Sequence, residues 1–92
     1  MIRSFRDKDT GDIFRQRRVP RFQNIERVAL RRLVQIDSSS ELRDLASPPA
    51  NRLEALKGDR AGQYSVRIND QYRVCFRWRG GDAFEVEITD YH

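Results

Sequence analysis

The spacing of apolar side chains changes along this chain from a helical period to a strand period, and this change restricts the possible folds most. In the first half, five apolar residues lie on one helical stripe: Ile25, Val28, Ala29, Leu33 and Ile36. In the second half, apolar and polar residues alternate over three segments: residues 64–68, 72–78 and 84–88. This order predicts an α+β fold, with two or three N-terminal helices packed on one face of a small, mainly antiparallel sheet.

Capping residues suggest the limits of the helices. Asp7 or Asp9 is suited to cap a short first helix. Pro20 suits the first position of the helix that covers residues 22–36. Ser40 follows that helix and is suited to cap a short third one.

Turn residues and alternation suggest how the strands are joined. Turns are expected at residues 69–71 and 80–81, where asparagine, aspartate and glycine tolerate positive φ. The alternation in the last strand predicts that Phe84, Val86 and Ile88 share one face of the sheet. Residues 2–5 also alternate, which predicts a short N-terminal strand.

The length of 92 residues fits a single domain, residues 1–92, with one thin two-layer core. No apolar stretch approaches the roughly 20 residues that cross a bilayer, and the first residues carry charge where a secretory peptide is apolar. The sequence has one cysteine, Cys75, and one histidine, His92. This composition excludes an internal disulfide and gives no zinc-binding cluster. We therefore expect a cytoplasmic protein that uses no metal or other cofactor.

Positive charge is in excess, with 18 basic and 14 acidic side chains, and only Lys8 and Lys57 of the basic ones are lysine. Arginine binds phosphate through two parallel hydrogen bonds and stacks on bases, so this bias favours contact with RNA or DNA. A GC-rich genome produces the same bias.

Three arginines lie close together in the predicted helix over residues 22–36: Arg27, Arg31 and Arg32. Residues 1–36 hold ten basic and four acidic side chains, so the positive charge is concentrated there. We predict that these arginines contact RNA. An ordinary solvated helix face is the alternative interpretation.

Arg67, Arg73 and Arg77 alternate with apolar residues in their strands, so we expect them on the sheet face that the helices leave open. Positive charge on that face suits an RNA phosphate backbone, and Arg67 is a further predicted RNA contact. The alternative is cross-strand pairing with Glu85 and Glu87, which is the interpretation we favour for Arg77 and for Arg79.

The last three residues, Asp90, Tyr91 and His92, directly follow the last predicted strand. If the strands are adjacent, they lie beside Arg73 and Lys57. An imidazole titrates near neutral pH and can transfer protons. Spacing alone, however, does not distinguish His92 from an ordinary terminal residue.

Residues 51–76 resemble the central block of the HigB-type toxins, the "plasmid maintenance system killer protein" group of the RelE/ParE superfamily. The resemblance rests on Leu-Lys-Gly-Asp-Arg at residues 56–60, Tyr-Arg at residues 72–73 and Asp-Tyr-His at residues 90–92. The opening residues 1–5 also fit that group, so the similarity covers essentially the whole chain.

This resemblance implies a RelE-like microbial RNase fold and the toxin of a type II toxin–antitoxin pair. Such a toxin is a ribosome-dependent endonuclease that cuts messenger RNA in the A site of the 30S subunit. Its expected partners are the ribosome, the message and a HigA-like helix-turn-helix antitoxin, through which the complex meets operator DNA. A ribose 2′-hydroxyl attacks the adjacent phosphate, and no metal is required.

The resemblance also implies roles for individual residues. His92 would act as acid or base, and Arg73 and Lys57 would stabilise the phosphorane. Asp90 would orient His92 or share the proton transfer, and Tyr91 would stack on a base or donate a hydrogen bond.

One position departs from the family pattern. Some members carry a histidine where this chain has Glu54. If that histidine transfers a proton in those members, either Glu54 replaces it as the base here or His92 acts alone.

Other interpretations compete with this one. ParE-type toxins are thought to share the fold but inhibit DNA gyrase without cutting nucleic acid, and a non-catalytic RNA-binding module would also explain the arginines. Structural roles are equally available: Lys57 ending a strand beside Gly58, Arg73 pairing with Glu87, and Tyr91 covering the edge of the core.

Overall fold

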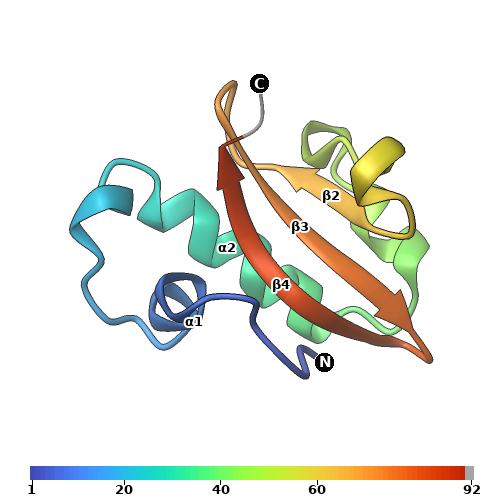
Figure 1. Ribbon diagram of the computed structural model, residues 1–92, viewed down its shortest axis with the longest axis horizontal. Coiled ribbons are helices and arrows are strands. Elements are labelled where there is room, and N and C mark those ends of the chain that lie inside the picture. Colours follow the sequence, from blue (N-terminus) through green and yellow to red (C-terminus); the bar gives the residue numbers. More distant parts are fainter. Residues whose placement is uncertain (91–92) are drawn as a thin grey trace.

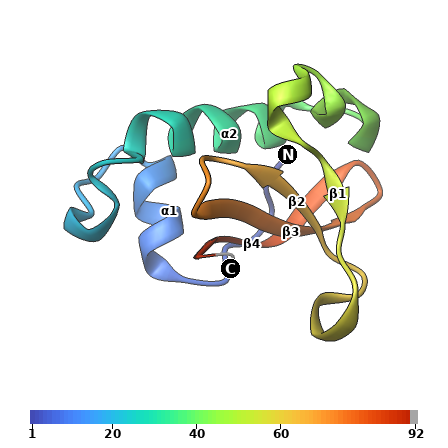
Figure 2. The same cartoon turned by 90° about the horizontal axis from the view of Figure 1, so that it is seen from above.

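Four strands form one antiparallel sheet in the computed structural model, which describes residues 1–90. The strands are adjacent in chain order: β1 (Glu54–Ala55), β2 (Tyr64–Arg67), β3 (Tyr72–Arg79) and β4 (Asp82–Asp90). Helix α2 (Glu26–Ser38) crosses one face of the sheet, and α1 (Lys8–Phe14) lies at the β4 side (Figures 1 and 2). The predicted α+β architecture is confirmed. Within residues 1–90, no helix is long and apolar enough to span a membrane.

The core lies between α2 and the sheet. On α2, the predicted stripe is buried at Ala29, Leu33 and Ile36. These side chains belong to one cluster with buried residues of the three longer strands: Val66, Val74, Phe76, Val86 and Ile88. The helix packs on the sheet through this apolar stripe, and the residues on its other faces are mostly polar, as in an amphipathic helix.

Two of the predicted helix starts are wrong. Pro20 begins a separate 3₁₀ turn, Pro20–Phe22, and α2 starts only at Glu26. Ile25 precedes α2 with φ −120° and ψ −1°, and its N–H donates to the carbonyl of Phe22. The chain therefore turns here, which allows the Phe22 ring to pack edge-on against Tyr72.

The third predicted helix is a 3₁₀ turn, Leu42–Ala46, and Ser40 is not its capping residue. Glu41 is the cap: its side chain accepts from the backbone of Asp44, whose carboxylate accepts from the N–H of Glu41. This reciprocal pair satisfies the donors at the start of the turn.

The first helix starts as predicted. The carboxylate of Asp7 caps α1 by accepting from the N–H of Thr10 at 3.0 Å. The hydroxyl oxygen of Thr10 in turn accepts from the N–H of Ile88 at 2.9 Å, which fixes α1 to β4.

The predicted hairpins are present, and Gly80 and Gly81 both have positive φ in the tight turn between β3 and β4. The predicted N-terminal strand is reduced to two isolated parallel bridges, which join Ile2 to Ala83 and Phe5 to Val86 along the outer edge of β4.

The prediction that Phe84 shares a face with Val86 and Ile88 is wrong. Cys75 pairs with Glu87 and Arg77 pairs with Phe84, so two residues of β4 face one residue of β3. This β-bulge reverses the alternation and places Phe84 on the sheet face opposite α2.

Candidate active site on the open face of the sheet

The sheet face opposite α2, called the open face below, carries a continuous set of polar side chains. The strand register brings six of these residues together: Glu54, Ser65, Arg73, Cys75, Glu87 and Thr89. They come from all four strands, which places their relative positions under the control of the backbone hydrogen bonds of the sheet. Figure 1 looks onto this face, with α2 behind it.

Arg73 is the central cation of the open face. Its Nε donates to Oγ of Ser65 at 2.7 Å, and its Nη2 donates to the carbonyl of Arg52 at 2.6 Å. The carboxylate of Glu54 lies 3.5 Å from the same Nη2. Arg73 lies on the open face as the alternation predicts, but its side chain is only 9% exposed. Among residues 1–90, Arg73 forms its ion pair with Glu54, and the alternative pair with Glu87 is not formed.

The backbone at Arg52 explains this geometry. Arg52 has φ 46° and ψ 56°, in the left-handed region, at the end of the 3₁₀ turn Pro49–Asn51. This conformation directs the chain into β1, where Glu54 lies opposite Ser65. It also turns the Arg52 carbonyl, just before β1, toward Arg73.

Arg60 is a second cation on the open face, and the residue-by-residue prediction did not include it. It ends the 3₁₀ turn Gly58–Arg60, and its Nη1 lies 2.9 Å from Oε1 of Glu87 and 3.1 Å from Oε1 of Gln63. Arg6 lies 3.9 Å from the same Glu87 oxygen. Arg60 belongs to the Leu-Lys-Gly-Asp-Arg block of residues 56–60, from which a catalytic role is predicted for Lys57 alone.

Cys75 lies beneath these cations and is fully buried. Burial raises the pKa of its thiol, which disfavours the thiolate, while the nearby Arg60 and Arg73 act in the opposite direction. The thiol therefore contributes packing to the open face and is unsuited to nucleophilic attack.

The other predicted catalytic residues are placed less closely. Glu54 is about half-exposed beside Arg73. Lys57 is exposed, three residues further along the chain, where the Gly58–Arg60 turn begins. Asp90 is the strand partner of Tyr72, one position beyond the open-face residue Thr89. Its carboxylate accepts a 3.0 Å hydrogen bond from Gln71. Tyr91 and His92 lie outside the described residues.

The structure separates the four predicted RNA-binding arginines. Arg27 and Arg31 are exposed on α2, whereas Arg67 forms an ion pair with Asp70. Arg32 is 9% exposed, and its Nε donates to the carbonyl of Arg67 at 2.8 Å. Burial, together with the positive charge of Arg31 and Arg67, lowers the pKa of Arg32. Arg32 therefore offers much less surface to RNA than Arg27 and Arg31 do.

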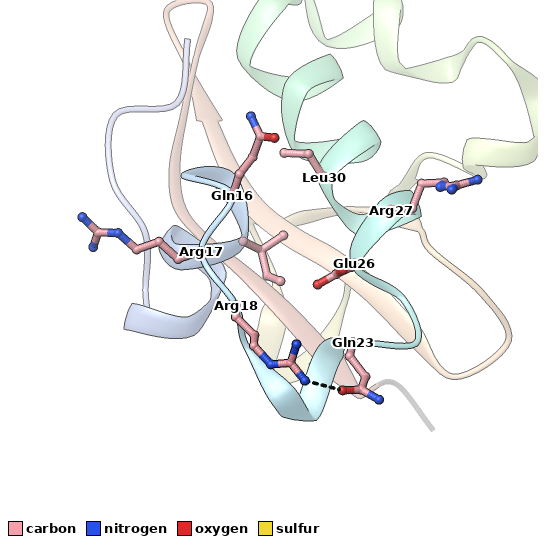
Figure 3. A pocket seen from close by; sticks show the side chains of 8 residues that line it. Gln16, Arg17, Arg18, Gln23, Glu26, Arg27 and Leu30 are labelled. Atoms are coloured by element: carbon pink, nitrogen blue, oxygen red, sulfur yellow. Dashed lines mark hydrogen bonds between the residues drawn. The ribbon is translucent and has the colours of Figure 1, made fainter.

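A groove of about 350 Å³ lies on the helical side of the protein, between the end of α1 and the start of α2 (Figure 3). Ile13 and Leu30 contribute apolar lining, and Arg18 donates across the groove to Gln23. Its lining has arginines and the acid Glu26 but no histidine, tyrosine or lysine, and all of it belongs to the described part of the chain. The open face instead places two carboxylates beside cations, Glu54 at Arg73 and Glu87 at Arg60, and is the better candidate for proton-transfer chemistry.

Metal ligation has little support in the described part of the chain. Residues 1–90 contain no group of three or more histidine, cysteine, aspartate or glutamate side chains arranged to hold a metal ion.

Comparison with known proteins connects this geometry to a family. Residues 3–92 match the family model described as "RelE-like toxin of type II toxin-antitoxin system HigB". The chain is 37% identical over 95 residues to Toxin HigB-1 of Vibrio cholerae serotype O1, covering 99% of this chain and 98% of that protein. It is 34% identical over 95 residues to Endoribonuclease HigB of Proteus vulgaris, covering both chains completely.

Similar solved structures agree on the fold. A chain of the YoeB–YefM complex from Staphylococcus aureus superposes with a TM-score of 0.57 at 17% identity, over 100% of this chain and 98% of that one. The YoeB/ParE toxin from Agrobacterium tumefaciens gives a TM-score of 0.51 at 18% identity, over 99% and 96%. At this level of identity the similarity concerns architecture alone.

Proposed function

The chain belongs to the HigB-like toxins, the RelE-like toxins of type II toxin–antitoxin systems, and on this premise we propose that it is an endoribonuclease that cleaves messenger RNA in the ribosomal A site. The full-length similarity to a relative named Endoribonuclease HigB supports this activity. We propose further that the reaction uses the protein's own side chains and no metal.

The observation that carries the proposal is the immobilised guanidinium of Arg73 on the open face. Transfer of a phosphoryl group builds negative charge on the phosphate oxygens, and preorganised donors stabilise that charge without reorganising during the reaction. Arg73 is held along two edges by Ser65 and Arg52, so its orientation is already set. Arg60 adds positive charge to the same face.

The proposed reaction is an internal transesterification. A base removes the proton of the ribose 2′-hydroxyl, and the 2′-oxygen bonds to the adjacent phosphorus. The bond from phosphorus to the 5′-oxygen breaks, and an acid protonates the departing oxygen. The products are a 2′,3′-cyclic phosphate and a 5′-hydroxyl end. The base and acid each contribute about 10² to 10⁴ in rate.

We assign the base to Glu54 and the acid to His92. Glu54 is supported by its position, because its carboxylate lies 3.5 Å from the cation that would bind the phosphate. Lys57 would add charge stabilisation from the end of β1. Asp90 would orient His92, and Tyr91 would stack on a base of the message. The roles of His92, Asp90 and Tyr91 rest on the family pattern.

The proposed partners follow from membership of the family. A HigA-like helix-turn-helix antitoxin would neutralise the toxin and bring the complex to operator DNA. The ribosome would present the message in the cytoplasm, and the exposed Arg27 and Arg31 on α2 would contact ribosomal RNA.

Primer extension on a defined message, translated in vitro with purified protein, tests this function. Wild-type protein should create new 5′ ends within codons. Glu54→Gln and His92→Ala should each lower the cleavage rate, while Arg43→Ala, on a distant 3₁₀ turn, should not. An absence of new ends with wild-type protein would contradict the proposal. Undiminished growth arrest after removal of Tyr91 and His92 would favour gyrase inhibition instead.

A further inference from the structure

The bulge in β4 presents an aromatic ring on the open face. Glu85 and Val86 together lie opposite Phe76, because Cys75 pairs with Glu87 and Arg77 with Phe84. Regular alternation would have placed Phe84 in the core with Val86. The extra residue instead puts Phe84 on the same side of the sheet as Arg77 and Arg73.

This arrangement requires an unfavourable backbone conformation. Glu85 has φ 51°, in the left-handed region that residues with a Cβ atom rarely adopt. Such outliers are common at functional sites, and bulges often redirect a side chain beside one. The side chain redirected here is Phe84.

A guanidinium group covers the Phe84 ring. The Cζ atom of Arg79 lies 4.7 Å from the ring centroid. Arg79 is exposed and Phe84 is half-buried, so this cationic pair is accessible from solvent. Among residues 1–90, no carboxylate forms an ion pair with Arg79, whereas the neighbouring Arg77 pairs with Glu85 at 3.0 Å.

The stack lies on the same face as the candidate catalytic cation. Phe84 is the strand partner of Arg77, which follows Arg73 by four residues on β3. At about 3.3 Å per strand residue, the stack is about 13 Å from Arg73 along the sheet. An RNA strand with its cleaved phosphate at Arg73 can therefore reach the stack with a base beyond the two nucleotides that adjoin that phosphate.

We propose that Arg79 and Phe84 form a stacking site for a nucleobase that flanks the cleaved dinucleotide. Bases of single-stranded RNA stack on aromatic rings and on arginine planes, and positive charge favours the adjacent backbone. This inference rests on the proposed endonuclease function and adds a substrate-binding role for two residues outside the catalytic group.

Phe84→Leu and Arg79→Lys test the site, because they keep apolar volume and charge but remove a planar surface. Cleavage is measured under single-turnover conditions on ribosomes that carry a defined message, as a function of toxin concentration. Each variant should raise the concentration for half-maximal rate by about 5- to 100-fold, since stacking acts on binding. The maximal rate should be retained.

A second set of messages identifies the stacked base. Each message carries an abasic nucleotide at one position around the cleavage site. At one position, the abasic nucleotide should raise the half-maximal concentration of wild-type protein by the same factor by which the substitutions raise it on the intact message. The variants should lose nothing further there, because the interaction is already absent.

Matched controls make the same chemical changes elsewhere. Phe14→Leu alters a ring on α1 that packs against Phe5, and Arg43→Lys alters an arginine that pairs with Glu41. Both should behave as wild type, and circular dichroism should show that all four variants fold. If Phe84→Leu and Arg79→Lys reached half-maximal rate at the same concentration as wild type, the stacking site would be overturned. It would also be overturned if wild-type protein bound every abasic message equally weakly. If wild-type protein cuts no message, the endonuclease function fails and the stacking site with it.

Discussion

The Nε of Arg73 donates a 2.7 Å hydrogen bond to Oγ of Ser65, and both side chains are buried in the sheet. Ser65→Ala leaves this N–H of a charged group without its acceptor. We expect the free energy of unfolding to fall by about 1–3 kcal/mol, measured by urea denaturation. Cleavage should also slow, because the guanidinium loses one of the hydrogen bonds that orient it. An unchanged denaturation midpoint would mean that another acceptor replaces the serine.

Arg73→Lys separates charge from geometry. Lysine keeps the positive charge but has no planar fork to bond Ser65 and Arg52 together. We expect a decrease of about 10² to 10³ in the single-turnover cleavage rate, typical of losing one preorganised donor. The protein should remain folded by circular dichroism. A wild-type rate would show that a point charge at this position is sufficient.

Much of the fold was predictable because it depends on local spacing. The apolar stripe of α2, the three longer strands and the Gly80–Gly81 turn are each specified by residues close together in sequence. The start of α2 was not predictable in this way. It depends on the Phe22 ring packing against Tyr72, a contact between residues far apart in the chain.

The candidate site was predicted in its residue types but not in its geometry. Alternation correctly placed Arg73 on the face away from α2, but its burial depends on the Arg52 carbonyl and on Ser65. Arg60 reaches Glu87 across 27 residues of sequence, which strand alternation does not reveal. Phe84 was assigned to the wrong face, since no residue in that strand signals a bulge at Glu85 as a glycine would.

The arginines of α2 should separate into two functional classes. Arg27 and Arg31 are exposed, so the double variant Arg27→Glu with Arg31→Glu should fold but bind ribosomes more weakly. The salt dependence of binding should also be smaller, because fewer phosphate contacts remain. Sedimentation with ribosomes at several salt concentrations measures both effects. Unaltered sedimentation would exclude contact with ribosomal RNA through this face.

Arg32→Glu should instead act on stability. It places a carboxylate in a nearly buried position beside the Arg67 carbonyl, which at present accepts from Arg32 at 2.8 Å. The Arg67 carbonyl then loses its donor and faces a carboxylate, and leaving a buried acceptor unsatisfied costs about 1–3 kcal/mol, a substantial part of the stability of a small domain. Thermal unfolding followed by circular dichroism should show a much lower midpoint than in the double variant. Equal midpoints would contradict the structural role of Arg32.

Acid should weaken the protein through Asp12 on α1. A hydrogen bond from Lys8, with Nζ 2.6 Å from Oδ2, and the positive charge of Arg17 hold the pKa of Asp12 below its usual value. Because the pKa is lower in the folded state, ionised Asp12 stabilises folding above the unfolded value of about 3.9. That contribution is lost as pH falls through the folded pKa.

Urea denaturation of wild type and Asp12→Asn at a series of pH values measures this effect. The difference in unfolding free energy should be constant near neutral pH and shrink in acid. Lys8→Met should reduce the part of the difference that depends on pH, since it removes the principal hydrogen bond. A difference that is independent of pH would assign the effect of Asp12→Asn to packing.

The strain at the β4 bulge is measurable by comparing two substitutions at Glu85. Glu85→Ala and Glu85→Gly both remove the ion pair with Arg77, but only glycine adopts φ 51° without a steric penalty. Glycine should therefore give the more stable protein, by about 1–2 kcal/mol at most. At Arg79, a strand residue of β3 without positive φ, the order should reverse and alanine should be more stable. Urea denaturation of the four variants gives both comparisons. If alanine were the more stable substitution at both positions, the backbone at Glu85 would be unstrained in solution, and Phe84 would occupy the covered face that simple alternation predicts.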